Sequence, residues 1–251
     1  MDPGVKGMIV TRRLVHRQAV VAACAAVVLA GCSFFGDAQQ KPVTSVPSPV
    51  SSASKTSTSA SVGTITPEKA NSLIIPKDDV AELVGSALDY EGKASDPQSS
   101  TAEGKASCRA LLVPLTTDIG SKWTTYRNVW YQEAKDTFDH LVIQRVLLYQ
   151  AKDDARETYS KEFPATVREC TGEELKTDTA TWRANVREVT EDRALWVLDH
   201  LADGQPSGSR CATEVRIIDN LLFSAMVCQQ GNGVPTVKAI MDRMAAATKP
   251  K

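Results

Sequence analysis

Apolar positions near the C-terminus recur with the period of an α-helix. After Pro235 they occupy positions i, i+3, i+4 and i+7, which places four side chains on one face: Val237, Ile240, Met241 and Met244. Because a helix has 3.6 residues per turn, such a stripe is typical of a helix packed against a core. Apolar residues four apart predict another helix over 151–163.

Helix-start signals predict further helices in the first half of the domain. Thr66 and Pro67 have the order of an N-cap and a first helical residue, which predicts a short helix. A second helix is predicted to begin around Asp79, which stands at capping-box spacing from Glu82. We expect one more helix over 108–119.

Six other segments are rich in β-branched and aromatic residues and predict strands. They cover 128–133, 140–150, 181–189, 193–201, 211–218 and 221–229. Strands with helices before, between and after them indicate an α+β fold. We therefore expect a central twisted antiparallel sheet of about six strands, packed with helices on one face and held by two disulfides.

The first 31 residues have the pattern of an export signal. An apolar run of 12 residues, 19–30, follows a cluster of basic residues: Arg12, Arg13 and Arg17. A run of this length is too short to span a bilayer, which needs about 20 residues, so it predicts a signal peptide. The general and the twin-arginine export routes both stay open, as does a start at Met1 or Met8.

The signal ends in Leu29-Ala30-Gly31-Cys32, which resembles the bacterial lipobox. In that motif the Cys thiol receives a diacylglyceryl group, and the peptide is cut just before it. Cys24 also follows small residues, but too few apolar residues separate it from Arg17 to form a signal core. The sequence therefore predicts a signal peptide over 1–31 and lipidation at Cys32.

The lipidated Cys32 is followed by a polar segment and then by one domain. Residues 32–66 are rich in Ser, Thr and Pro, a composition that cannot bury enough apolar surface to offset its ordering entropy. We expect this segment to be a disordered tether. Residues 67–251 are long enough for a single domain with its own core. The domain would then sit on the extracytoplasmic face of the cell membrane.

Charge excludes one class of partner. The chain has 29 basic and 30 acidic residues, and the signal takes four of the former and one of the latter, so the rest carries a net charge of −4. Without a basic cluster, a protein has no electrostatic means of holding a phosphate backbone. We expect no nucleic-acid partner.

Four cysteines remain after Cys24 and Cys32 are set aside, and an even number in an exported chain indicates disulfides. Four reduced core cysteines would fit a cytosolic protein, which the export signal disfavours. If residues 219–220 form a two-residue hairpin turn, facing residues have numbers that sum to 439. Cys211 and Cys228 satisfy this sum and would form a non-hydrogen-bonded pair, close enough for a disulfide. By elimination, Cys108 pairs with Cys170.

In order, these features resemble the PknH-like extracellular sensor domain, a family named after a mycobacterial serine/threonine kinase and also found on lipoproteins. The resemblance covers residues 67–251 and rests on the four cysteines in order, the strand pair at 129–148, Ala151–Ala155 opening a helix, Cys170-Thr171-Gly172, and Ile217–Asn220. It implies a two-disulfide α+β domain with a cleft suited to a ligand, and it implies no catalytic activity. This chain has no kinase domain, so direct signalling into the cytoplasm does not follow.

Residue types that carry catalysis or bind metals are sparse. His140 and His200 lack metal-site spacing, so we expect no metal and no cofactor. Adjacent acids read as helix starts or solvated surface: Asp78-Asp79, Asp153-Asp154, Glu173-Glu174 and Glu191-Asp192. Four aromatic residues cluster at 123–131 and read either as core or as a cleft wall: Trp123, Tyr126, Trp130 and Tyr131.

The leading hypothesis is a non-enzymatic, lipid-anchored ligand-binding or sensor-like module. Its partners would be the membrane, through Cys32, and a small molecule or cell-wall ligand in a cleft. One alternative is a cell-envelope lipoprotein that binds another protein and no small ligand. A less favoured one is an envelope hydrolase that uses paired acids. A concave pocket with convergent polar groups would favour the leading hypothesis, and a flat apolar patch would favour the first alternative.

Overall fold

A computed structural model describes residues 65–97, 101–116, 119–136 and 138–249. The signal peptide, Cys32 and the tether up to residue 64 lie outside the described residues. Residues 58–251 form a compact unit that contains all of the described core. A segment with its own core can fold alone.

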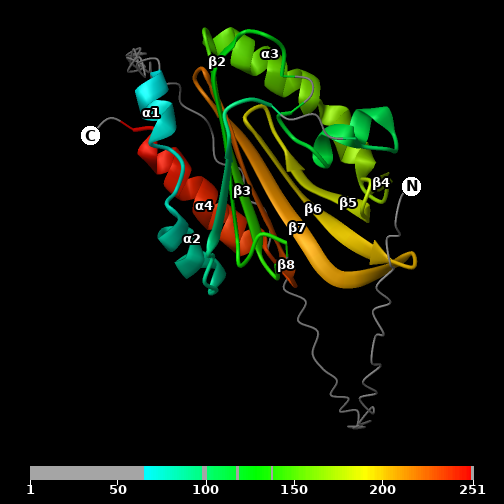
Figure 1. Ribbon diagram of the computed structural model, residues 1–251. Helices are drawn as coiled ribbons and strands as arrows, with labels where there is room; N and C mark the ends of the chain where they lie inside the picture. The colour runs from blue at the N-terminus through cyan, green and yellow to red at the C-terminus, as the bar shows by residue number, and fades with distance from the viewer. Residues whose placement is uncertain (1–64, 98–100, 117–118, 137, 250–251) are drawn as a thin grey trace, which may run out of the picture. The chain divides into compact units, whose positions relative to one another are not determined.

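The domain is built on one antiparallel sheet of eight strands (Figure 1). The strand order is β1-β2-β3-β8-β7-β6-β5-β4. The strands are β1 (Tyr90–Ala94), β2 (Trp123–Gln132), β3 (Leu141–Tyr149), β4 (Glu174–Lys176), β5 (Thr181–Val189), β6 (Arg193–Ala202), β7 (Gln205–Ile218) and β8 (Leu221–Gln230). The mixed helix-and-antiparallel-sheet fold is confirmed, but the predicted number of about six strands is wrong. The two extra strands, β1 and β4, form opposite edges of the sheet.

The helices are α1 (Pro67–Asn71), α2 (Lys77–Val84), α3 (Lys152–Glu162) and α4 (Val234–Ala247), with 3₁₀-helices η1 (Ala106–Leu111) and η2 (Ala165–Cys170). The Thr66 hydroxyl accepts a hydrogen bond from the Lys69 amide, as an N-cap should. The predicted capping box at Asp79 does not form, because α2 begins at Lys77 and has no side-chain cap. The helix expected over 108–119 is limited to η1.

Both faces of the sheet are covered, which corrects the expectation of one covered face. Along β6, Leu195 and Val197 belong to one core cluster, and Trp196 and Leu198 to the other. The first cluster includes α1, α2 and α4, and the second includes α3, η1 and η2 (Figure 1). Strands buried on both faces carry continuous apolar runs, as β8 does, rather than strict alternation.

The hairpin between β7 and β8 has the predicted register. Ile218 faces Leu221, and Cys211 faces Cys228 with their Cα atoms 3.9 Å apart and a disulfide between them. The second disulfide joins Cys108 to Cys170 across 62 residues and connects η1 to η2. Both disulfides therefore join the cysteines that the sequence pairs.

The turn residue Asn220 has a further role, because its side chain is 2% exposed. Its Oδ1 accepts a hydrogen bond from the Ile65 amide, and its Nδ2 donates to the Tyr149 carbonyl at 2.9 Å. The turn thereby fixes the first described residues of the domain against the end of β3.

Candidate functional site

The face of the sheet that carries α3 contains a row of polar side chains in its middle strands. Asn128 of β2 faces Arg145 of β3, which in turn faces Ser224 of β8. Facing residues in an antiparallel sheet lie on the same side, about 5 Å apart. We call these three residues the polar row.

An apolar row lies next to the polar row on the same face. Two residues further along each strand, Trp130 faces Ile143 and Ile143 faces Met226, and these three residues form the apolar row. Thr213 of β7 faces Met226 and ends this row. Two residues along a strand correspond to about 7 Å. All three apolar side chains are only partly buried, unlike the cores on either side.

Buried polar atoms without a hydrogen-bond partner concentrate on this face. Of nine such side-chain atoms among the described residues, five lie here: Tyr126 Oη, Asn128 Oδ1, Arg145 Nε, Thr213 Oγ1 and Ser224 Oγ. Buried polar groups in native proteins are nearly always satisfied by protein, water or ligand. Tyr126 and Arg145 interact with each other, so the side-chain oxygens of Asn128, Thr213 and Ser224 mark the place on this face where water or a ligand would complete the bonding.

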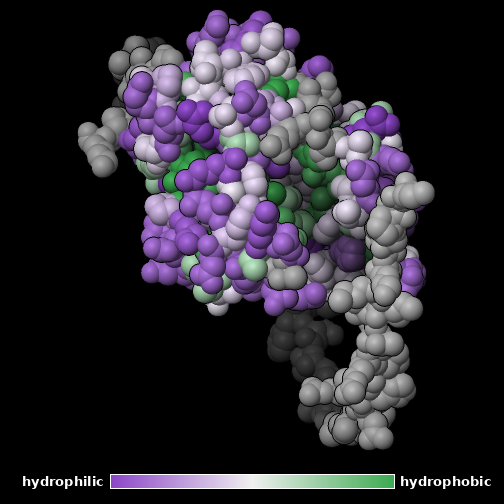
Figure 2. All heavy atoms as spheres, viewed as in Figure 1, coloured by the Kyte–Doolittle hydropathy of each residue, from purple (hydrophilic) through white to green (hydrophobic). Residues whose placement is uncertain are grey.

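The surface is hollowed beside α3. Figure 2 shows a depression in front of the middle strands, below α3, in which hydrophobic side chains gather. The polar row, the apolar row, Tyr126 and Thr213 lie on the face of the sheet that carries α3; Asn128 and the apolar row are partly exposed, and the other four residues are buried. We call the part of this face that these eight residues form the sheet hollow. A concave apolar surface with a few convergent polar groups is the usual form of a small-molecule site.

Arg145 dominates the electrostatics of the sheet hollow. It is 8% exposed, and its Nε has no hydrogen-bond partner. Burial lowers the pKa of its guanidinium, while the nearby Tyr126 and Glu162 oppose that shift. Burial also raises the pKa of Tyr126, against the effect of Arg145. The Glu162 carboxylate accepts a hydrogen bond from the Leu115 amide at 3.0 Å.

The Trp130 indole lies over the edge strand β1, which has no side chain at that point. Gly92 of β1 faces Trp130, and a Cβ atom at Gly92 would lie 2.0 Å from the indole Cε2. No real Cβ makes so short a contact, so the indole lies across β1 only because residue 92 is glycine.

A second cavity of about 680 Å³ lies between η1 and the end of α3. Among its lining residues, Arg109 is exposed, and Lys161 and Glu162 have interaction partners. The sheet hollow is the stronger candidate site because buried polar atoms without a partner lie there, whereas none occurs among the described residues that line this cavity.

The aromatic cluster expected at 123–131 is divided by the sheet. Tyr126 and Trp130 belong to the sheet hollow, whereas Tyr131 lies on the opposite face and donates a hydrogen bond to the Ile75 carbonyl. Trp123 packs edge-on against Tyr126 at 6.2 Å. Tyr126 and Tyr131 are therefore core residues, whereas the cleft wall stays a prediction for the partly exposed Trp123 and Trp130.

The two histidines lie apart from the sheet hollow. His140 contacts the Glu133 carboxylate at 2.7 Å, and Ser86 donates to the same oxygen. His200 lies 5.1 Å from the Trp182 ring and contacts Ser207. Within the described part of the chain, no group of three His, Cys, Asp or Glu side chains could hold a metal ion.

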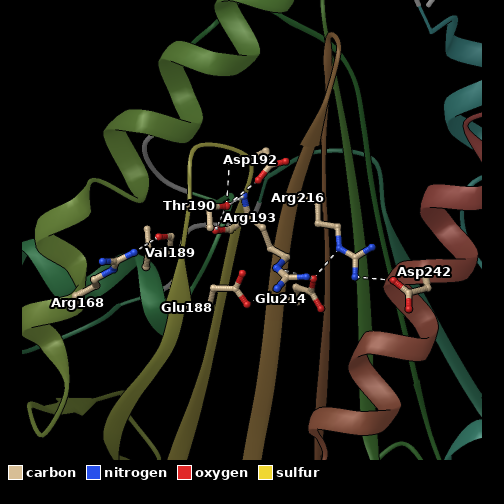
Figure 3. A network of polar contacts seen from close by, with 9 residues as sticks. All are labelled: Arg168, Glu188, Val189, Thr190, Asp192, Arg193, Glu214, Arg216 and Asp242. Atoms are coloured by element: carbon tan, nitrogen blue, oxygen red, sulfur yellow. Dashed lines mark hydrogen bonds and ion pairs between the residues drawn. The ribbon is translucent and has the colours of Figure 1, made fainter. Parts of the chain in front are cut away.

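Of the acid pairs, those at 78–79 and 153–154 lie in the first turns of α2 and α3, as predicted. On the face opposite the sheet hollow, a buried acid holds α4 to the sheet (Figure 3). Glu214 is fully buried, accepts a hydrogen bond from Arg216 at 2.6 Å and lies 3.8 Å from Arg193. Arg216 in turn contacts Asp242 of α4 at 2.8 Å. In this network the acidic and basic side chains pair with one another, so we assign it to holding α4 against the sheet rather than to ligand binding.

Sequence reasoning missed the polar row, although the strands contain a signal for it. Arg145, together with Gln144, interrupts the apolar run of β3, and Ser224 interrupts that of β8. A polar residue inside such a run marks either a satisfied core contact or a site. Only the strand register, which places Arg145 and Ser224 side by side, distinguishes a site from a satisfied core contact.

Comparisons with known proteins agree with this architecture. The sequence pattern of the PknH-like extracellular domain matches residues 65–247. The crystal structure of the extracellular domain of PknH from Mycobacterium tuberculosis superposes with a TM-score of 0.63 at 16% identity, covering 74% of this chain and 97% of that one. This likeness shows a shared fold. No curated protein matches the chain.

Two further structures are more distant. A protein from Mycobacterium smegmatis, the Rv0999 ortholog, gives a TM-score of 0.30 at 10% identity over 70% of this chain and 97% of that one. CalU16 from Micromonospora echinospora gives 0.22 at 11% identity over 63% and 87%. In the described segments, every helix is too short or too polar to cross a membrane. With the family pattern matched over most of its length, the chain belongs to the family of PknH-like extracellular domains.

Proposed function

We propose that this protein is a lipid-anchored, extracytoplasmic sensor-like module that binds a small ligand in the sheet hollow and performs no catalysis. The observation that carries the proposal is a set of buried polar atoms without a hydrogen-bond partner on one face of the sheet, those of Asn128, Thr213 and Ser224, beside the buried Arg145. A flat apolar surface, which a purely protein-binding module would present, does not explain them. The family to which the chain belongs is one of extracellular domains, which supports the location.

The lipid anchor is part of this proposal and rests on Leu29-Ala30-Gly31-Cys32. The anchor would leave the domain at the end of a tether of about 34 residues, with a root-mean-square reach of roughly 30–35 Å. A domain so placed can meet envelope molecules without crossing the membrane. How occupancy reaches the cell would then depend on another membrane protein.

The test is native mass spectrometry of residues 58–251, secreted by the native host and purified without detergent. We expect a co-purifying small molecule in the wild-type protein. Ile143→Trp, which fills the apolar row, should lose that molecule. Arg243→Trp adds the same side chain at an exposed position of α4, on the opposite face, and should retain it.

Repeatedly empty wild-type protein would overturn the proposed function. So would a bound molecule that Ile143→Trp retains in full, because its site would then lie elsewhere. Thermal unfolding of both variants shows that each is folded before its occupancy is compared.

A further inference from the structure

We propose that the ligand of the sheet hollow is a small amphiphilic anion, with its acidic group held at the polar row and its apolar body along the apolar row. This inference rests on the proposed function and adds the chemical class of the ligand. The inference follows from the order of side chains along the strands, because the charged Arg145 lies in the polar row and the apolar row lies next to it.

The acidic group is indicated by Arg145. A buried guanidinium is costly in a low-dielectric site, and Glu162 and Tyr126 offset only part of that cost for Arg145, whose Nε has no hydrogen-bond partner. Carboxylates and phosphates match the guanidinium fork, and they accept several hydrogen bonds at once. A bound acid would therefore complete the electrostatics of the site as well as its hydrogen bonds.

Neutral donors surround the same position. The Ser224 hydroxyl has no partner, and the Tyr126 hydroxyl interacts with Arg145; both residues are 1% exposed. Hydroxyl groups can donate to an anion, whereas Asn128 can donate through its amide nitrogen. The Glu162 carboxylate, whose charge raises the pKa of Arg145, accepts a hydrogen bond from the Leu115 amide.

The apolar body is indicated by the next two rows along the strands. Trp130, Ile143 and Met226 come first, and Leu141 follows beside the Cys211–Cys228 disulfide. Each row adds about 7 Å of largely apolar surface, on which a short acyl or aromatic group would lie. The partial exposure of these side chains shows that no part of the described chain covers them fully.

Three probes of equal length and different charge test the inference: sodium octanoate, octylammonium chloride and 1-octanol. Their binding to residues 58–251 is measured by isothermal titration calorimetry at low salt. We expect octanoate to bind at least tenfold more tightly than either of the others. Arg145→Gln should reduce the preference for octanoate over octanol to less than threefold, while Arg183→Gln, which removes an exposed arginine in β5, should leave it unchanged.

The comparison of the three probes on the wild-type protein does not depend on any variant, so it stands even if Arg145→Gln fails to fold. In that case, Ser224→Ala gives the second measurement and should weaken octanoate binding more than octanol binding. Equal or tighter binding of octanol or octylammonium would overturn the anionic class and leave the proposed function intact. A neutral or cationic molecule on the host-purified protein would do the same. Failure of every probe, together with empty host-purified protein, would overturn both.

Discussion

At the scale of single residues, buried polar groups in this domain fall into two kinds. Gln144 and Asn220 are fully engaged: Gln144 accepts from the Ile75 amide at 2.9 Å and donates to its carbonyl at 3.0 Å. Such groups fix the chain where secondary structure does not. Arg145 and Ser224 belong to the second kind, with unpartnered atoms that face the sheet hollow. Unpartnered atoms also occur outside the sheet hollow, as at Glu214 Oε2, so the grouping of Arg145 with Ser224 and Asn128 on one face is what marks the site.

Glu133 gives a pH prediction at the same scale. Burial alone would raise its pKa, but hydrogen bonds from His140, its own amide and Ser86 lower it from 4.5 to about 2. A depressed folded-state pKa stabilises the native state above pH 4.5, and this stabilisation is lost as the pH falls through about 2. Glu133→Gln should therefore lower the free energy of unfolding by roughly 1–3 kcal/mol at pH 7 and by almost nothing at pH 2.

Urea denaturation of both proteins between pH 2 and 7 measures this difference. Glu82→Gln removes an exposed acid in α2 and is the matched control, with no expected change across the range. A loss of stability in Glu133→Gln that is the same at both ends of the range would show that the carboxylate acts through packing alone.

Sequence patterns identify charged residues that act locally, such as those at a helix start, but not the distant residues with which a buried charge interacts. The acid pair at 153–154 could be assigned to a helix start because the relevant interaction is local. The polar row could not be assembled, because Asn128, Arg145 and Ser224 meet only through the non-local pairings β2–β3 and β3–β8.

At the scale of elements, the periodicity of apolar residues was sufficient to predict most strands of the sheet and helix α4. Val237, Ile240, Met241 and Met244 are all fully buried, as their spacing predicts. The two missed strands lack that periodicity: β1 has Gly92 at its centre, and β4 is only three residues long. Both are edge strands whose pairing with β2 and β5 comes from the sheet rather than from their own propensity.

The two disulfides should differ in what they stabilise. Loss of the Cys108–Cys170 bridge, in Cys108→Ala/Cys170→Ala, releases a loop of 62 residues and should cost about 4 kcal/mol, against about 3 for Cys211→Ala/Cys228→Ala. The first bridge is the covalent link between η1 and η2, which are short 3₁₀-helices. The second joins two strands that a ten-pair ladder already holds.

Hydrogen exchange distinguishes the two effects in native conditions. Amides of η1 and η2 should lose protection in Cys108→Ala/Cys170→Ala, while β7 and β8 keep theirs in Cys211→Ala/Cys228→Ala. Unchanged protection of η1 and η2 without their bridge would show that packing around Trp196, whose indole donates to the Leu111 carbonyl, is enough to hold them.

At the scale of the whole molecule, the expected lipid anchor would place the domain where its proposed ligand is found. The sheet hollow needs exposure to envelope molecules, and the disulfides need an oxidising compartment, which export would supply. The expected tether would separate the domain from the membrane surface while keeping it nearby. In the proposed function, the location of the domain would thus depend on a single modification near the N-terminus.

That modification gives the last prediction, which concerns the full chain in its own host. Cys32→Ser removes the thiol that forms the thioether, so it should abolish incorporation of labelled palmitate and cleavage before residue 32. Cys24→Ser removes the other N-terminal cysteine, inside the apolar run, and should leave both processes unchanged. Labelling and N-terminal mass are the appropriate measurements, because an uncleaved signal could hold the variant on the membrane by its apolar run. Persistent labelling of Cys32→Ser, or a mature wild-type chain that begins at another residue, would place the anchor elsewhere and remove the basis for this location of the domain.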